Sequence, residues 1–314
     1  MERPIFILSI PRSGSTLLQR ILTGTSECAT LGETSLLLRL LGEPKDISRY
    51  SSYREQNIEI AKDDIRKNWN GFDDSYRRHV RFLMEDIYTN LAEGKRFFID
   101  KTPRYTLIID EIYKTFPDAY YILLFRHPLA VAASLSNTFR SGHWWLDNHR
   151  ADLTTALDKL YAFHKAHEAT PNVTSIRYED LVADNKRTLL KINEMLGIKE
   201  FETPEDVQLS TTNRGRLGDP TGISKYKNVS MDSLEKWIDD YKNFYRVRWA
   251  KKYFGSLNPE FLEEFKYEFP EILRLTNPKF MLRPGFSDLI NQRRLENKAR
   301  KRTLRMFKNK RIIT

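Results

Sequence analysis

Short apolar runs that alternate with helical patterns constrain the fold of this chain most strongly. Three such runs are residues 5–10, 97–99 and 120–125, and a fourth strand is expected at 173–178; each is followed by a helical stretch. Strands joined by helices run parallel, and a parallel sheet needs cover on both faces. The alternation therefore predicts an α/β fold in which helices flank a central parallel sheet.

The helices are expected where apolar residues recur at helical spacing or follow a helix-start signal. These stretches are residues 16–22, 35–41, 74–93, 107–116, 128–136, 151–169 and 179–196, the last ended by Gly197. Residues 43–70 are rich in Ser, Asp, Lys and Arg, and we expect a mobile surface segment there.

The positive charge is concentrated at one end of the chain. The net charge is +10, and residues 292–311 hold ten Lys or Arg and one acid, which leaves the remainder near +1. We therefore expect one domain over residues 1–285 and a basic C-terminal tail over 286–314. Residues 292–311 contain one aromatic residue, Phe307, so no nucleic-acid partner is expected. A peripheral contact of the tail with an anionic membrane stays open.

The chain shows the features of a cytoplasmic protein. Cys28 is its only cysteine, so no disulfide can form within the chain. The first apolar run is too short for a membrane span and continues into a polar loop, unlike a signal peptide.

A candidate anion-binding loop follows the first strand. Residues 9–16, Ser-Ile-Pro-Arg-Ser-Gly-Ser-Thr, join strand to helix, and such a turn directs N–H groups and the positive helix end at an anion. The loop resembles a nucleotide P-loop, but serine replaces the lysine, which weakens the alternative of a kinase or NTPase. We expect a P-loop-like domain with five anion-binding residues: Arg12, Ser13, Gly14, Ser15 and Thr16. An ordinary polar turn is the alternative.

A second candidate anion site follows the run at 120–125. Arg126 stands at the carboxyl end of that strand, where ligands bind in open α/β sheets, and Ser134 lies eight residues further on. The two side chains can hold one isolated phosphate. A surface ion-pair arginine is the alternative.

Together these motifs resemble the superfamily of sulfotransferases that use 3′-phosphoadenosine 5′-phosphosulfate (PAPS). PRSGSTLL at 11–18 resembles the family's 5′-phosphosulfate loop, and Arg126 with Ser134 its 3′-phosphate pair. The resemblance extends over residues 4–240, including 173–198. It implies sulfuryl transfer from PAPS to an acceptor hydroxyl, with release of 3′,5′-ADP.

The likeness is closest to the tyrosylprotein sulfotransferase type. The Gly-Glu-Thr motif of that type appears at 32–34, and the resemblance implies that Glu33 is the catalytic base. It also implies that Lys101 contacts the transferring sulfuryl group. An acid that complements a helix dipole is the alternative for Glu33, and a surface lysine for Lys101. Pro103 and Arg104 stand where the small-molecule enzymes have their histidine base. His143 is the alternative base, with a packing or acceptor-site residue as the other interpretation. The family's Gly-rich adenosine loop is only loosely echoed by 214–222, and the anchor and disulfides of the animal enzymes are not expected.

The resemblance also implies roles for two further residues. Tyr178 is expected near the adenosine, with a core tyrosine as the alternative, and Lys236 near the 3′-phosphate. No metal is expected, since no His, Cys or Asp cluster has metal-ligand spacing. The acceptor stays open among a peptide tyrosine, a sugar, a lipid and a small metabolite, and the oligomeric state is unassigned.

Overall fold

The computed structural model describes residues 1–42, 53–140, 142–144, 146–198, 234–241, 243–275 and 288. Two compact units divide the chain: Met1–Arg126 with Ala151–Met231, and His127–Arg150 with Asp232–Thr314. The Gly-rich segment 214–222 and nearly all of the basic tail lie outside the described residues, so the domain boundary near 285 stays a prediction.

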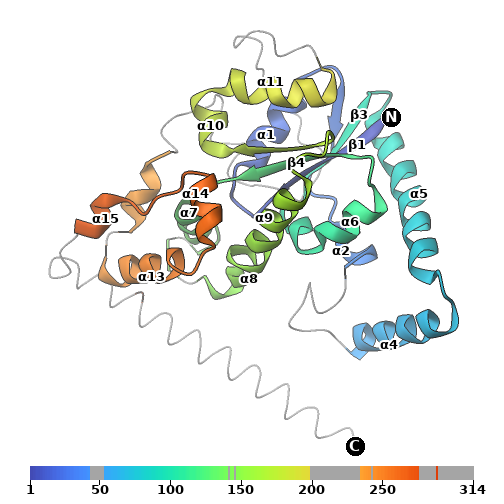
Figure 1. The fold of residues 1–314 in the computed structure, drawn as a ribbon, viewed down its shortest axis with the longest axis horizontal. Helices are drawn as coiled ribbons and strands as arrows, with labels where there is room; N and C mark the ends of the chain where they lie inside the picture. Colours follow the sequence, from blue (N-terminus) through green and yellow to red (C-terminus); the bar gives the residue numbers. More distant parts are fainter. Residues whose placement is uncertain are drawn as a thin grey trace, which may run out of the picture. The chain divides into compact units, whose positions relative to one another are not determined.

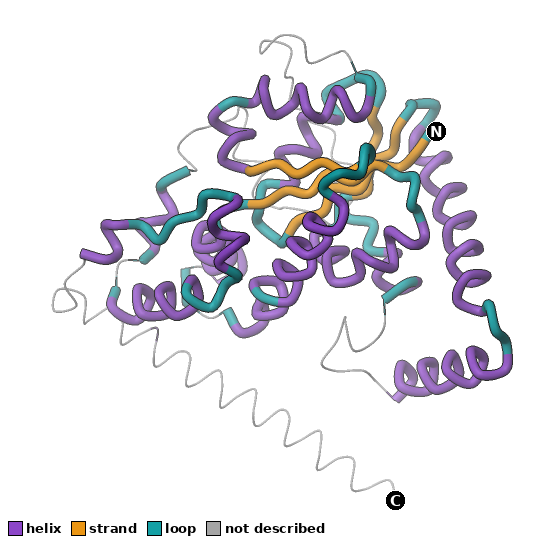
Figure 2. Tube along the Cα trace, in the orientation of Figure 1, coloured by secondary structure: helices purple, strands orange, loops and turns teal. Residues whose placement is uncertain are grey.

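The first unit is built on a parallel sheet of five strands in the order β2-β3-β1-β4-β5 (Figures 1 and 2). The strands are β1 (Arg3–Ser9), β2 (Cys28–Thr30), β3 (Phe97–Asp100), β4 (Tyr120–Phe125) and β5 (Val173–Arg177). The predicted α/β fold is confirmed. The central strand β1 is apolar on both faces, and Ile5 to Leu8 are fully buried, because helices cover both sides of the sheet.

Helices of the first unit lie on both sides of this sheet in Figure 1, with α1, α10 and α11 on one side and α6 and α9 on the other. The helical elements are α1 (Ser15–Leu22), α2 (Leu36–Leu40), α4 (Tyr53–Asn68), α5 (Phe72–Ala92), η1 (Pro103–Ile108), α6 (Ile109–Thr115), α9 (Thr155–His167), α10 (Tyr178–Ala183) and α11 (Asn185–Leu196). The short helix α8 (Arg150–Leu153) spans the point where the chain passes between the units.

The second unit is helical in its described part. It contains α7 (Pro128–Arg140), η2 (Asp147–His149), η5 (Lys236–Asp240), α13 (Phe244–Phe254), α14 (Pro259–Glu264) and α15 (Glu271–Leu275). Asp288, inside the stretch expected to be tail, is buried and accepts hydrogen bonds from Arg246 Nε (2.8 Å) and Asn243 Nδ2 (3.0 Å).

The structure differs from the expected elements in several places. The stretch 151–169 is divided into α8 and α9, and 107–116 begins in η1 before α6. The helix α4 occupies most of residues 43–70, where a mobile segment was expected, because i,i+3 ion pairs such as Arg66–Asp63 stabilise a polar helix. The stretch 179–196 is two helices, since Asp184 caps the second by accepting from Arg187 N at 3.1 Å. The three-residue strand β2 was not predicted.

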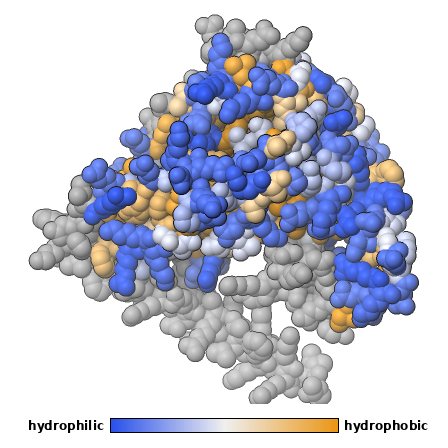
Figure 3. Space-filling view, viewed as in Figure 1, coloured by the Kyte–Doolittle hydropathy of each residue, from blue (hydrophilic) through white to orange (hydrophobic). Residues whose placement is uncertain are grey.

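The described surface is mainly hydrophilic on the face shown in Figure 3, with small apolar patches between charged side chains. Among the described residues, no helix combines the length and the apolar character that a membrane crossing requires. Cys28 is buried.

Candidate active site

The topology brings most of the predicted site residues to one edge of the first unit's sheet. All five strands run parallel, so the segments after β1, β2, β3, β4 and β5 leave the same edge. These segments carry the anion loop, Glu33, Lys101, Arg126 and Tyr178 respectively. The strand register shows how far along the sheet each strand ends. Leu124 of β4 pairs with Ser9 of β1, whereas Asp100 of β3 pairs with Phe6 of β1. Lys101 therefore leaves the sheet several residues below the anion loop.

The backbone of the anion loop has a conformation suited to binding an oxyanion. Arg12 (φ 70°) and Gly14 (φ 95°) are left-handed, so the chain turns sharply before α1 begins at Ser15. No side chain caps the start of α1 and no acid stands in its first turn, which leaves the positive helix end available to an anion.

Two buried serine hydroxyls in this loop also fit an anion. Among the described residues, the Oγ atoms of Ser9 and Ser13 are buried without a hydrogen-bond partner. Buried hydroxyls in native proteins are nearly always bonded, so the orphaned donor of Ser13 fits a bound phosphate or sulfate oxygen. Ser15 is buried beside it, and Thr16 is half-buried.

Arg126 and Tyr178 close the other side of the loop. The Arg126 guanidinium donates to the carbonyl of Arg12 at 3.0 Å and stacks 4.2 Å above the Tyr178 ring. The same ring packs against Gly14 so closely that a Cβ there would stand 2.3 Å from Tyr178 Cδ2. Glycine is thus required at this position for two reasons, the left-handed backbone and the close approach of the ring.

Lys101 and Glu33 form an ion pair at the end of β3. Lys101 Nζ donates to Glu33 Oε1 at 3.1 Å; the lysine side chain is 2% exposed and the glutamate 27%. Lys101 is therefore buried, and the alternative of a surface lysine does not apply. Glu33 precedes α2, which begins at Leu36, and its carboxylate contacts the ammonium of Lys101.

Sequence reasoning missed the carboxylate next to Lys101. Asp100 is fully buried, and its Oδ2 accepts from the hydroxyls of Tyr88 (2.5 Å), Thr34 (2.8 Å) and Tyr105 (3.2 Å). Burial raises its pKa, and these hydroxyl bonds work in the opposite direction. The family resemblance drew attention to Lys101, and no local pattern indicated that Tyr88 and Tyr105 bind its neighbour.

A second missed contact joins α1 to the strand before Glu33. Gln19 Nε2 donates to Thr30 Oγ1 (2.7 Å) and to the carbonyl of Leu31 (3.2 Å), while Thr30 Oγ1 donates to Ile99 O (2.7 Å). The helix that follows the anion loop is thereby tied to the segment that leads into Glu33.

The second unit holds the other predicted residues. Ser134 is half-buried on α7, and Lys236 is exposed at the start of η5. These two elements pack together, since Asn137 Nδ2 donates to Asp240 Oδ2 at 2.8 Å and Tyr241 OH donates to Leu129 O at 2.8 Å.

His143, the alternative base, is also in the second unit. Its side chain is exposed, and its carbonyl accepts from Ser136 Oγ at 3.2 Å. The described contacts assign no role to its imidazole.

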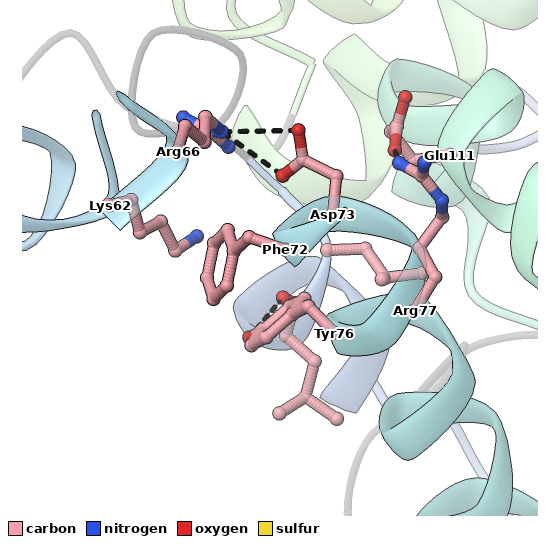
Figure 4. A pocket seen from close by; sticks show the side chains of 9 residues that line it. Lys62, Arg66, Phe72, Asp73, Tyr76, Arg77 and Glu111 are labelled. Atoms are coloured by element: carbon pink, nitrogen blue, oxygen red, sulfur yellow. Dashed lines mark hydrogen bonds and ion pairs between the residues drawn. The ribbon is translucent and has the colours of Figure 1, made fainter. Parts of the chain in front are cut away.

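A pocket in the first unit lies apart from these residues, between α2, α4, α5 and α6 (Figure 4). Its two arginines pair with neighbouring acids, Arg66 with Asp63 and Asp73 on one side and Arg77 with Asp74 and Glu111 on the other. The charges compensate one another, so the pocket has the character of a structural ion network. The lining residues are Leu40, Leu41, Lys62, Arg66, Phe72, Asp73, Tyr76, Arg77 and Glu111.

Comparison with known proteins identifies the family. A model of the "Sulfotransferase family" matches residues 4–203. Protein-tyrosine sulfotransferase 1 of Danio rerio is 25% identical over 306 residues, which cover 95% of this chain and 80% of that protein. Nodulation protein NoeE of Sinorhizobium fredii is 34% identical over 136 residues, 43% of this chain and 31% of NoeE, so the match spans less than a third of that relative.

Two solved structures share the fold. The sulfotransferase domain from the curacin biosynthetic pathway has a TM-score of 0.57 and 22% identity, over 86% of this chain and 99% of that domain. The sulfotransferase domain of the Synechococcus PCC 7002 olefin synthase has a TM-score of 0.51 and 24% identity, over 86% and 96%. The family match includes the anion loop, Glu33, Lys101 and Arg126, and from it we conclude that this chain is an enzyme of the sulfotransferase family, within the PAPS-dependent superfamily expected from its motifs.

Proposed function

We propose that this sulfotransferase takes the sulfuryl group of PAPS and transfers it to an acceptor hydroxyl at the sheet edge where Glu33 and Lys101 meet. The anion loop would hold the 5′-phosphosulfate through its N–H groups, with Arg12 and the Ser13 hydroxyl. Arg126 would hold the 3′-phosphate.

Three further residues complete the proposed nucleotide site. Ser134 and Lys236 would bind the 3′-phosphate with Arg126, as the family resemblance implies. Tyr178 would pack near the adenosine, and its ring already supports the Arg126 guanidinium at 4.2 Å.

The observation that carries this proposal is the buried ion pair between Lys101 and Glu33. A lysine side chain with 2% exposure is costly to keep charged unless it meets anions. Glu33 supplies one anion, and the transferring sulfuryl would supply another. Both side chains follow strands that end at the edge carrying the anion loop.

The chemistry follows from these charges. PAPS supplies an activated sulfuryl group whose bond to the bridging phosphate oxygen breaks as a bond to the acceptor oxygen forms. The loop N–H groups, Arg12 and Lys101 would stabilise the charge that spreads over the peripheral oxygens. The ion pair engages Glu33 Oε1, so Oε2 is the atom proposed to take the acceptor's proton.

The acceptor proposed for the first trial is a peptide tyrosine. Protein-tyrosine sulfotransferase 1 is similar over 95% of this chain, and the sequence motif around Glu33 resembles that type. A sugar, a lipid and a small metabolite are the other acceptor classes.

The test is transfer of labelled sulfur from PAPS to acceptors of each class, with the wild-type chain and a Glu33→Ala control. We expect label on at least one acceptor class with wild type and a loss of at least about 100-fold with the control. If 3′,5′-ADP binds but no labelled product forms from any class or from a cell lysate, the proposal is wrong about the reaction.

A further inference from the structure

Two consecutive residues at the end of β3 contact two consecutive residues of the loop that carries Glu33. Lys101 Nζ donates to Glu33 Oε1 at 3.1 Å, and Thr34 Oγ1 donates to Asp100 Oδ2 at 2.8 Å. One contact is an ion pair between a buried lysine and a partly exposed glutamate, and the other is a hydroxyl bond to a fully buried carboxylate. The two contacts together fix the register between the loop and the strand end.

Further hydrogen bonds fix the residues that follow in the loop. Tyr105 OH lies 2.8 Å from Thr34 Oγ1 and accepts from Leu37 N at 3.2 Å. The hydroxyl of Thr102 accepts from Ser35 N at 3.2 Å. The segment from Thr34 to Leu37 is thus bound at three positions to residues that follow β3.

Asp100 is the acceptor on which these bonds converge. Its two carboxylate oxygens accept from four hydroxyls, those of Thr34, Tyr88, Thr102 and Tyr105. Three of these hydroxyls, those of Thr34, Tyr88 and Tyr105, approach the same oxygen, Oδ2, and Thr34 Oγ1 also lies 2.8 Å from Tyr105 OH. Each hydroxyl has one proton, so Thr34 and Tyr105 share their bonds between each other and Asp100. Within the described residues its bonds go to hydroxyls alone, so its charge acts through this network and not through an ion pair.

We propose that Asp100 is a positioning residue for Glu33: through Thr34 and Tyr105 it sets the loop register in which Glu33 meets Lys101. The functional consequence rests on the proposed role of Glu33 as the base, whereas the tether itself does not. A base has to stand within hydrogen-bond reach of the proton that it takes, and a displacement of about 1 Å costs roughly 100-fold in rate.

The test removes single hydroxyls, because Asp100→Ala would take the acceptor from the buried hydroxyls of Tyr88, Thr102 and Tyr105 together and would threaten the fold. Thr34→Val removes the hydroxyl bond to Asp100 and keeps the β-branched shape, and Thr34→Ser restores the hydroxyl. Tyr105→Phe has a matched control in Tyr121→Phe, because Tyr121 is also fully buried and donates to Phe116 O at 2.7 Å.

Two readouts separate positioning from stability. Amide hydrogen exchange of residues 32–37 reports the order of the loop, and kcat and KM for PAPS report its effect on turnover. We expect Thr34→Val and Tyr105→Phe to accelerate exchange at 32–37 and to lower kcat by about 10- to 100-fold, with KM for PAPS within about 3-fold of wild type. Thr34→Ser should recover most of kcat, and Tyr121→Phe should change neither readout.

Two results would overturn the proposal. One is unchanged exchange at 32–37 in Thr34→Val, and the other is a loss of kcat in Tyr121→Phe as large as that in Tyr105→Phe. Glu33→Gln tests the underlying function separately: if this variant keeps turnover, Glu33 is not the base, and the exchange at 32–37 then decides alone whether Asp100 positions the loop.

Discussion

Replacing Glu33 by glutamine tests the ion pair and the proposed base together. Glutamine keeps the size of the side chain and an oxygen at the Oε1 position, 3.1 Å from Lys101 Nζ. It removes the negative charge and the ability to take a proton at the reacting oxygen. General-base assistance contributes 10²- to 10⁴-fold, so kcat should fall by roughly that factor.

The effect on stability should be moderate. Two unit charges about 4 Å apart interact by about 4 kcal/mol at an effective dielectric of 20. The Glu33 side chain is 27% exposed, so water screens part of this attraction, and the retained oxygen still accepts a hydrogen bond. We expect the free energy of unfolding to fall by about 1–3 kcal/mol. Binding of 3′,5′-ADP should be kept or slightly tightened, since an anion is removed near an anionic ligand.

The matched control is Glu27→Gln. Glu27 stands before β2, is 26% exposed in its side chain, and pairs with Arg96 at 2.9 Å. It has nearly the exposure of Glu33 at the opposite end of the same strand. The assays are single-turnover kcat with PAPS and thermal unfolding with and without 3′,5′-ADP. If Glu33→Gln keeps kcat within about 3-fold of wild type while losing stability, Glu33 is structural, and His143 is the next residue to replace.

Three further predictions follow from the nucleotide site and the tail. Arg126→Ala should raise KM for PAPS by at least about 10-fold with kcat at saturation nearly unchanged, because the 3′-phosphate is remote from the reacting bond; a collapsed kcat at constant KM contradicts this. Gly14→Ala should abolish 3′,5′-ADP binding, since its Cβ would meet the Tyr178 ring at 2.3 Å, whereas Gly71→Ala (φ 111°, nothing within 4 Å) should keep binding; equal loss in both refutes the packing argument. Deleting residues 290–314 should leave nucleotide binding and the melting temperature within about 2 °C of wild type, as differential scanning fluorimetry will show.

The sequence predicted those parts of the fold that depend on local pattern. The strands β1, β3 and β4 contain continuous apolar runs, so composition and spacing indicated them. The strand β5, Val-Thr-Ser-Ile-Arg, is of mixed polarity. The strand β2 is Cys-Ala-Thr, three residues with no apolar run, and it forms because β3 beside it offers hydrogen bonds. The helix α4 was missed because a polar helix bound by charge pairs lacks the apolar stripe on which such predictions depend.

The candidate site also has a part that the sequence predicted and a part that it did not. Contiguous residues, the anion loop above all, could be recognised along the chain, and the expected neighbours Lys101 and Glu33 are 3.1 Å apart. The network around Asp100 could not be predicted, because Tyr88 and Tyr105 reach it from α5 and η1. Such contacts depend on how elements pack, and one sequence holds no periodic signal for them.

The most direct test of the account is a comparison of two nucleotides in thermal unfolding of the wild-type chain. A ligand at 100 times its Kd stabilises by about 2.7 kcal/mol, which for a chain of this size is a rise of about 4 °C in melting temperature. The account predicts this rise for 3′,5′-ADP and a clearly smaller one for 5′-AMP at the same concentration, since only the former has the 3′-phosphate proposed for Arg126. Equal shifts for the two nucleotides, or none for either, would contradict it.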